Sequence, residues 1–284
     1  MRENNILFNI KTSYSQFTKA EKKVADFVIS SPEKVLFMSI TDVADECGVA
    51  EASVYRFCRT MKAKGYQEFK MNLSFCLSKR GAQSAPDQNV GAVNGSSLLA
   101  DKVLANHINA LNATRQLVVP SQIEKVVEMI HDAEMVSFFG IGHSLLTARE
   151  ANNKFLRITG KTSCIEDSHM QAMSAAMMTE KDVMIILSYS GATKDTVYVA
   201  EIAKEAGAGI VAITRFRKSP LAVYADEILL CGADEAPLDG GSLGVKMSQL
   251  YVVDLLFQEY FHKYHDESEE NLKKTSKAVV EKLY

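Results

Sequence analysis

The chain has 284 residues, 47% of them hydrophobic and 24% charged, which suits two domains of ordinary size and excludes fibrous and wholly disordered proteins. The net charge of −3 is unevenly distributed: residues 1–80 hold 13 Lys and Arg against 9 Asp and Glu, whereas the remaining 204 hold 19 against 26. A basic first part joined to an acidic second part is expected when only the first approaches a polyanion.

No segment predicts a membrane span or a signal peptide, because no uncharged apolar run of about 18 residues occurs and the first residues lack a basic and then apolar stretch. The five cysteines are scattered, without a C-x-x-C pair. We therefore expect a cytoplasmic protein with reduced thiols and no membrane partner. The six histidines lack metal-ligand spacing, so we expect no metal and no other cofactor.

A segment poor in large apolar residues and rich in Gly, Ser, Asn and Gln separates two parts of different pattern. It covers residues 81–97 and predicts a linker. Before it, over residues 1–80, every periodic segment is helical. After it, over residues 98–284, helical stretches alternate with short apolar runs, which predicts a three-layer α/β domain with a parallel, doubly wound sheet.

The N-terminal part has the layout of an all-α helix-turn-helix domain. Thr18-Lys-Ala-Glu21 is a capping box that predicts a helix through about Ile29. Further on, Thr41 can cap a short helix, Gly48 permits a left-handed turn, and a second helix is expected to run to about Met61.

The second of these helices is expected to enter the major groove of double-stranded DNA. Val54, Phe57 and Cys58 recur at helical spacing and should face inward, which leaves the remaining side chains for bases and phosphates. The predicted DNA-binding residues are Thr41, Glu51, Ala52, Ser53, Tyr55, Arg56, Arg59, Lys62, Lys64 and Lys70. A plain helical hairpin with solvated charges fits the same pattern.

Two strand-to-helix junctions in the C-terminal part are expected to carry the ligand chemistry. Apolar runs at 135–139 and 183–187 predict strands, and each leads into a loop with glycine and hydroxyl side chains, at 140–144 and 188–193. Both loops fall at the carboxyl ends of parallel strands, where glycine, hydroxyls and helix N-termini cradle phosphate. The predicted phosphate ligands are Ser144, Ser188, Ser190 and Thr193.

Other kinds of loop fit these two segments less well than an anion site. Leu145 stands where a dinucleotide-binding G-x-G-x-x-G/A loop needs its third small residue, and no P-loop pattern occurs. Plain helix capping would account for one such loop, whereas two of them favour an anion site.

The motifs resemble those of a known family. Ser188-Tyr-Ser-Gly-Ala-Thr193-Lys-Asp195 resembles the S-x-S-G-x-T-x-[DE] loop of the sugar isomerase (SIS) domain, and Gly140-Ile-Gly-His-Ser144 resembles its G-x-G-x-S loop. The stretches 54–59 and 65–70 resemble the N-terminal helix-turn-helix of the RpiR family of bacterial transcription regulators. The resemblance implies a phosphosugar site formed by Gly142, His143, Ser144, Ser188, Tyr189, Ser190, Thr193 and Lys246. The chain departs from the family pattern at Ala50 and Ser53, and Lys246 stands where many members carry arginine.

We therefore expect a transcription regulator of carbohydrate metabolism genes, in which a phosphosugar orders the two loops and changes operator affinity. The alternative is a sugar-phosphate isomerase with an appended helical domain. No catalytic residue is predicted, because an ordinary role such as ion pairing or helix capping can explain each residue that could act as a base. These residues are Glu150, Glu166, Asp167, His169 and Glu235. The methionines at 170, 173, 177 and 178 recur at helical spacing and are expected in the core or in a subunit interface. The helix at 243–260 has more apolar surface than one packing face requires, which favours a homodimer or homotetramer.

Overall fold

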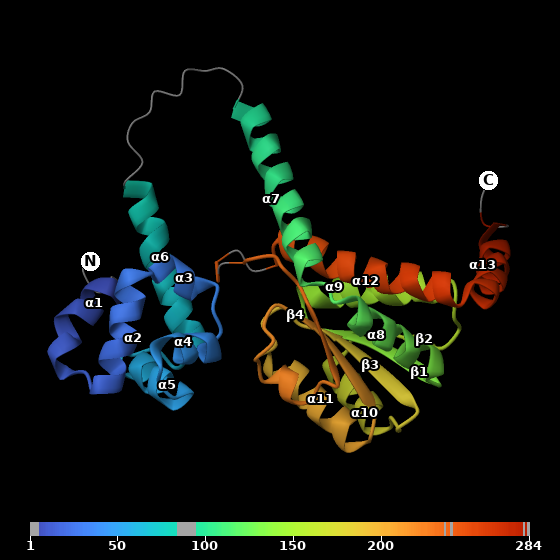
Figure 1. The fold of residues 1–284 in the computed structure, drawn as a ribbon, viewed down its shortest axis with the longest axis horizontal. Helices are drawn as coiled ribbons and strands as arrows, with labels where there is room; N and C mark the ends of the chain where they lie inside the picture. The colour runs from blue at the N-terminus through green and yellow to red at the C-terminus, as the bar shows by residue number, and fades with distance from the viewer. Residues whose placement is uncertain (1–5, 84–94, 236, 239–240, 281, 283–284) are drawn as a thin grey trace. The chain divides into compact units, whose positions relative to one another are not determined.

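The computed structural model describes residues 6–83, 95–235, 237–238, 241–280 and 282, shown in Figure 1. The chain divides into two compact units, one formed mainly by residues 1–102 and the other by residues 103–233 and 241–284. The predicted linker lies largely at 84–94, outside the described residues, and helices occupy both of its ends. The boundaries at residues 80 and 97 stay predictions.

The first unit is all helical. Its elements are α1 (Ile6–Ser13), η1 (Tyr14–Gln16), α2 (Lys19–Ser30), α3 (Pro32–Leu36), α4 (Ile40–Cys47), α5 (Glu51–Thr60) and α6 (Tyr66–Gln83). The predicted capping box at the start of α2 is confirmed, since the Thr18 hydroxyl accepts from the Glu21 backbone N–H while Glu21 accepts from the Thr18 N–H. In the core, the fully buried Phe57 ring meets Phe17 and Phe69 edge-on, at 5.4 and 5.5 Å between centroids.

The predicted turn between α4 and α5 is confirmed, but the predicted cap of α4 is wrong. Gly48 ends α4 in the left-handed conformation, with φ of 58°. The N-cap is Ser39, which forms a capping box with Asp42, and Thr41 lies inside the helix. Serine and threonine are both common N-cap residues. Only Ser39 has an acidic residue three positions later, which can accept a hydrogen bond from its backbone N–H and complete a capping box.

Lys70 of α6 is buried, which contradicts its prediction as a DNA contact. Its ammonium donates to the backbone carbonyls of Leu36 and Met38, at 3.3 and 3.1 Å, and lies 5.3 Å from the centre of the Tyr66 ring. Burial lowers the pKa of Lys70 to about 8, and the Asp42 carboxylate partly opposes this shift. The lysine therefore ties α6 to the end of α3 and takes no part in the surface that faces solvent.

Lys70→Met should remove part of the pH dependence of stability. Between pH 8 and 10.5 the unfolded chain keeps a proton that folded Lys70 has lost, so the free energy of unfolding rises with pH. Cys58, whose pKa is raised to about 12 by burial, acts in the opposite direction above pH 9.0. Urea unfolding measures this difference. Between pH 8 and pH 9 the free energy of unfolding should increase by about 1 kcal/mol less in the variant than in the wild type. Exposed Lys64→Met is the control, and an equal loss there would contradict the assignment.

The second unit is a three-layer α/β domain, as predicted. Its helices are α7 (Gly95–Leu117), which belongs to this unit from Val103 onward, α8 (Pro120–Asp132), α9 (His143–Phe155), α10 (Ser168–Ala176), α11 (Lys194–Glu205), η2 (Leu221–Val223), α12 (Leu243–Lys263) and α13 (His265–Val280). Its strands are β1 (Met135–Gly140), β2 (Thr162–Ser163), β3 (Asp182–Leu187), β4 (Gly209–Thr214) and β5 (Glu227–Leu230). They form one parallel sheet in the order β2-β1-β3-β4-β5.

Both faces of this sheet are buried, which explains the continuous apolar runs in its strands. Along β3, Ile185 and Leu187 pack with α8, α9 and α12, whereas Met184 and Ile186 pack with α10 and α11 (Figure 1). The strands predicted at 135–139 and 183–187 are confirmed within one residue at either end.

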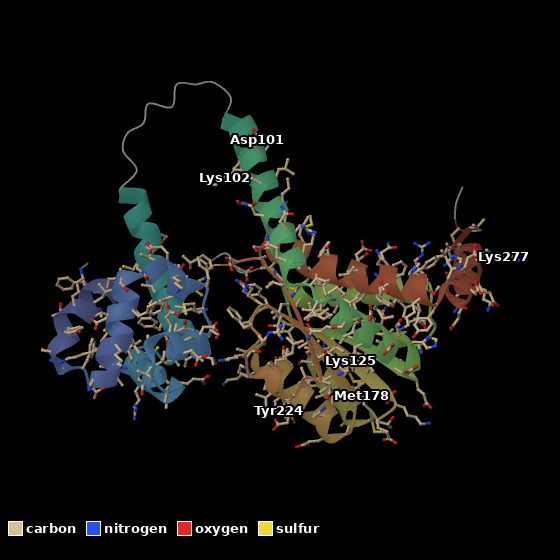
Figure 2. The ribbon with its side chains drawn as sticks, in the orientation of Figure 1. Asp101, Lys102, Lys125, Met178, Tyr224 and Lys277 are labelled. Atoms are coloured by element: carbon tan, nitrogen blue, oxygen red, sulfur yellow. The ribbon has the colours of Figure 1, made fainter. Side chains whose placement is uncertain are left out.

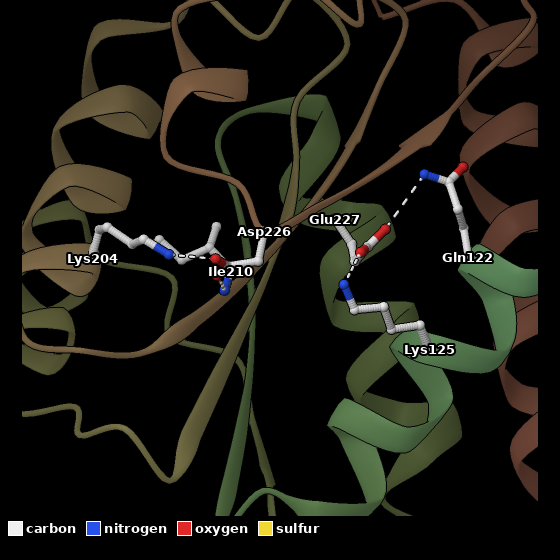
Figure 3. Close-up of polar contacts among 6 residues, drawn as sticks. All are labelled: Gln122, Lys125, Lys204, Ile210, Asp226 and Glu227. Atoms are coloured by element: carbon white, nitrogen blue, oxygen red, sulfur yellow. Dashed lines mark hydrogen bonds and ion pairs between the residues drawn. The ribbon is translucent and has the colours of Figure 1, made fainter.

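Two strands were not predicted from the sequence, and one of them begins beside a pair of acidic residues. Asp226 accepts from the Ile210 backbone N–H at 2.8 Å and pairs with Lys204 at 2.5 Å, as Figure 3 shows. The next residue, Glu227, points to the other face of the sheet, where it pairs with Lys125 at 2.5 Å and accepts from Gln122 at 3.4 Å. Polar partners from both helical layers thus hold the start of β5, which hydropathy alone does not signal.

Candidate functional site

The two loops predicted to bind phosphate begin side by side. β1 and β3 are hydrogen-bonded neighbours, and the last residue of β1, Gly140, lies in register with the last residue of β3, Leu187. The loops that follow therefore leave the same edge of the sheet, each leading into a helix, α9 and α11 respectively. In doubly wound folds this edge is where ligands bind.

The first loop places backbone N–H groups at the start of α9. A side chain at Gly140 would come within 2.7 Å of the Ser144 carbonyl carbon, so the turn closes only with glycine there. Gly142 is the N-cap residue, with φ of 59°, and it offers no side chain to cap the helix. His143 and Ser144 form the first turn, whose N–H groups and helix dipole favour an anion.

The second loop keeps its hydroxyl side chains close to the start of α11. Ser188 is buried, and its backbone N–H donates to the Ile213 carbonyl at 3.0 Å. The Ser190 hydroxyl accepts from the Ala192 N–H at 3.2 Å. Thr193 is the N-cap of α11, yet its side chain makes no capping hydrogen bond. The predicted hydroxyls and two helix N-termini therefore converge on one edge of the sheet, which is the arrangement that binds phosphate.

Residues after β4 hold the second loop in place, and they were not predicted from the sequence. The Tyr189 carbonyl accepts from the Thr214 hydroxyl at 3.1 Å and from the Arg215 N–H at 3.0 Å. Gly191, with φ of 58°, lies against Ser219, whose Cβ would be 2.7 Å from any side chain placed there. The signal was their position directly after an apolar run, which puts them at the same sheet edge.

Gln171 of α10 supports the first loop and was also missed. Its side-chain amide donates to the carbonyls of Ile165 and Gly140, at 2.7 and 3.4 Å. The residue is buried, and its amide links the start of the first loop to the segment before α10. The spacing of apolar residues in the sequence does not show that a glutamine on this helix is buried against a loop, so this role could not be predicted.

The segment before α12 lies against the first loop. A side chain at Gly241 would collide with the imidazole of His143, so the backbone there packs on that ring. Ser242 caps α12 by accepting from the Val245 N–H at 3.3 Å, and Lys246 follows in the first turn of the helix. His143 and the helix that carries Lys246 are thus brought together.

The predicted DNA-binding residues lie mainly on α5 and the turn after it. Those that are exposed are Glu51, Ala52, Tyr55, Arg56, Arg59, Lys62 and Lys64. The Thr41 hydroxyl donates to the Glu51 carboxylate, so the starts of α4 and α5 are joined. Ser53 is buried and its hydroxyl accepts from Arg56 at 3.1 Å, which contradicts its prediction as a solvent-facing DNA contact. It orients Arg56 instead.

Two of the residues considered as catalytic bases have structural roles. Glu166 pairs with Arg149 at 3.1 Å, and Asp167 caps α10 by accepting from the Met170 N–H at 3.0 Å. Over the part of the chain that the structure describes, no three His, Cys, Asp or Glu side chains are grouped to hold a metal, and no helix there could cross a membrane.

Gly191→Ala should weaken binding of a phosphorylated ligand at least about tenfold, because a side chain at φ of 58° strains the backbone and displaces Ser219. The strain should also lower the free energy of unfolding by about 1–3 kcal/mol. Isothermal titration calorimetry and urea unfolding measure the two effects. Gly160→Ala is the matched control, since a side chain there meets nothing within 4 Å; unchanged binding in Gly191→Ala would contradict the role of this loop.

Known proteins resemble the whole chain. The family described as "Helix-turn-helix domain, rpiR family" matches residues 4–80, and the SIS domain family matches residues 129–258. An uncharacterized HTH-type transcriptional regulator of Haemophilus influenzae is 35% identical over 99% of this chain and 98% of its own length. The HTH-type transcriptional regulator HexR of Escherichia coli is 29% identical over 99% of this chain and 96% of its own.

Solved structures agree with these matches. The NanR protein of Vibrio vulnificus, complexed with ManNAc-6P, superposes with a TM-score of 0.88 at 29% identity, covering 98% of this chain and 99% of that one. The sugar isomerase domain of an RpiR transcription factor from Sphaerobacter thermophilus covers 63% of this chain and 98% of its own, with a TM-score of 0.56 and 25% identity.

Proposed function

Because this chain belongs to the RpiR family of helix-turn-helix transcription regulators with a SIS domain, we propose that a phosphosugar held between its two hydroxyl-bearing loops sets its affinity for operator DNA. The observation that carries the proposal is the register of Gly140 with Leu187, which places both loops at one sheet edge. Ser144, Ser188, Ser190 and Thr193 hold the phosphate together with the first N–H groups of α9 and α11. The domain that contains them is acidic overall, so these local donors supply the attraction.

The sugar end of the effector faces His143 of the first loop and the start of α12. His143 packs on the segment that leads into α12, and Lys246 lies in the first turn of that helix. We assign both to contacts with the sugar. The backbone N–H of Tyr189 helps to hold the phosphate, and the backbone of Gly142 also lines the phosphosugar site. ManNAc-6P, the compound in the NanR complex, is accordingly the first effector to test.

The operator is read by the exposed face of α5. Arg56 and Arg59 contact bases or phosphates in the major groove, while Lys62 and Lys64 contact the flanking backbone. Two copies acting on a roughly palindromic operator, as a homodimer or homotetramer, match the symmetry that such helices need. The effector can change operator affinity at most by the ratio of its own affinities for two arrangements of the paired N-terminal domains. We place the protein in the cytoplasm and assign it the control of carbohydrate metabolism genes.

A thermal-shift titration tests the effector part of the proposal. The melting temperature should rise with the logarithm of concentration for at least one phosphosugar, starting with ManNAc-6P, and should not rise for the same sugars without phosphate. Operator binding is then measured with and without that compound. A set of hexose and amino-sugar phosphates that leaves the melting temperature unchanged would refute the assignment.

The isomerase alternative predicts a different result from the same samples. We propose that the protein catalyses no reaction, since its relatives that cover the whole chain are named as transcription regulators. Nuclear magnetic resonance of the stabilising phosphosugar, incubated with the protein, should show no second sugar phosphate. Steady conversion would establish an enzyme.

A further inference from the structure

The C-terminal half of α7 is firmly attached to the second unit. Thr114 is fully buried, where its hydroxyl donates to the Ala110 carbonyl at 2.7 Å and accepts from the Gly232 N–H at 3.0 Å. The Ser248 hydroxyl of α12 donates to the same Ala110 carbonyl at 3.3 Å. A side chain at Gly232 would come within 2.7 Å of the Ala113 carbonyl oxygen. This half of the helix therefore has a fixed place on the domain.

The part of α7 that precedes Ala110 exposes large apolar side chains. Leu99 is 62% exposed, Val103 45%, Leu104 58% and Ile108 46%. A short helical stretch without tertiary contacts is marginal in water, and clustered exposed apolar residues mark a surface that binds another protein. This stretch of α7 therefore offers a surface for another protein.

The apolar residues form one broad face without Asp, Glu, Lys or Arg. At about 100° of rotation per residue, Leu99, Val103, Leu104 and Ile108 fall on one half of the helix circumference. The acidic and basic residues between Leu99 and Thr114 are Asp101 and Lys102, which Figure 2 labels on α7, and His107. By the same rotation Asp101 and Lys102 fall on the other half of the circumference, whereas His107 falls on the apolar half. A partner that covers this face therefore meets apolar side chains and one imidazole, but no carboxylate, ammonium or guanidinium group.

We propose that the partner is the same helix face of a second copy, with the two α7 helices antiparallel about a two-fold axis near Val103 and Leu104. A two-fold interface joins a patch to itself, so the patch must tolerate its own chemistry. This face brings no like charges together. Leu99 and Ile108 are equally far from the midpoint between Val103 and Leu104. In an antiparallel pair about that midpoint, Leu99 of one copy therefore lies at the height of Ile108 of the other, and Val103 at the height of Leu104. The pairing names the interface for the homo-oligomer of the proposed function, but it does not require the effector.

A rival surface exists on α10 and the residue after it, where Met170, Met173 and Met177 are 51%, 62% and 82% exposed. These methionines lie on one side of the helix and were expected in the core or in a subunit interface, whereas the following Met178 is buried. They provide a matched control, because substituting them removes exposed apolar surface of similar size from a different helix.

Sedimentation velocity of the full chain tests the pairing. The wild type should sediment as a dimer or tetramer, and Leu104→Ser combined with Ile108→Ser should raise the dissociation constant of the α7 contact at least about 100-fold, because four apolar side chains leave the interface. Met173→Gln with Met177→Gln should leave the assembly unchanged. A monomeric wild type, an unaffected Leu104/Ile108 variant, or dissociation by the methionine substitutions instead would each overturn the proposal.

Disulfide trapping tests the geometry with substitutions that keep the helix. Val103→Cys should form a covalent dimer under mild oxidation, because the axis brings the new thiol close to its counterpart in the second copy. Leu99→Cys should not, since the antiparallel pairing separates the two thiols by nine residues, or about 13 Å along the helix, beyond disulfide reach. Equal trapping at both positions, or at neither, would overturn the antiparallel pairing.

The effector response separates this proposal from the proposed function. The Leu104/Ile108 variant should still show the phosphosugar-induced rise in melting temperature, because the pairing does not require the effector. Absence of that rise from the wild type would instead count against the proposed function and leave the pairing to be judged by sedimentation and trapping alone.

Discussion

Replacing Arg56 and Arg59 together with alanine is expected to weaken operator binding at least about 30-fold. Both guanidinium groups lie on exposed positions of α5, three residues apart, so they share the helix face opposite Val54 and Phe57. A contact of this kind to a base or phosphate contributes about 1–3 kcal/mol, and two of them give the stated loss. Fluorescence anisotropy with a labelled operator, at one fixed salt concentration, measures it.

The control for this experiment must remove two positive charges from a helix other than α5. Lys273→Ala with Lys274→Ala does so on the exposed α13 helix, where each lysine forms an ion pair with a glutamate of the same helix. The arginine variant should also show a shallower dependence of affinity on salt than this control, because fewer counterions are released on binding. Equal operator affinity in the two variants would show that α5 does not read the DNA. Phosphosugar binding should be the same in both.

Ser188→Ala combined with Ser190→Ala should abolish the response to the effector. Hydrogen bonds to a charged group contribute about 1.5–3 kcal/mol each, so losing two hydroxyls weakens phosphosugar binding at least about 100-fold. Calorimetric titration measures the affinity, and operator binding with and without ligand measures the response. Operator affinity without effector should equal that of the wild type, because the hydroxyls lie in a different unit from α5.

Ser174→Ala on α10 provides the control for the loss of a hydroxyl. It should bind the effector as the wild type does. If the loop variant kept its effector affinity, the phosphate would have to bind elsewhere, and the assignment of both loops would fail. Circular dichroism should show that the loop variant remains folded, since Ser188 joins its neighbours through its backbone N–H, which alanine keeps.

Local chemistry was predicted correctly where one short segment decides the outcome. The Thr18 box, the left-handed Gly48 and the strands flanking the ligand loops follow from residue type and spacing alone. The sequence was less decisive where two nearby residues could serve as the same cap. Ser39, and not Thr41, caps α4 because the Asp42 carboxylate completes a capping box with Ser39. Both hydroxyls are the right type, and the position of the acid decides.

The misplaced residues depend on how separate elements pack. Lys70 has the sequence pattern of a surface lysine, but α6 turns it toward carbonyl groups of the segment that ends α3, and no periodicity encodes that contact. Thr214 and Ser219 support the second loop because β4 lies beside β3 in the sheet. The proximity of the two loops likewise depends on the pairing of β1 with β3, although β2 comes between them in sequence.

The carbonyl of Tyr189, held by both the Thr214 hydroxyl and the Arg215 N–H, has a kinetic consequence. A loop whose backbone is already hydrogen-bonded loses little conformational entropy when a ligand arrives, so ordering of this loop cannot be the main event that the effector triggers. Association should then be a single bimolecular step, with an observed rate that rises linearly with phosphosugar concentration and reaches no plateau. The rate at which the protein responds to a change in metabolite level would then be set by the metabolite concentration and not by a slow rearrangement of this loop.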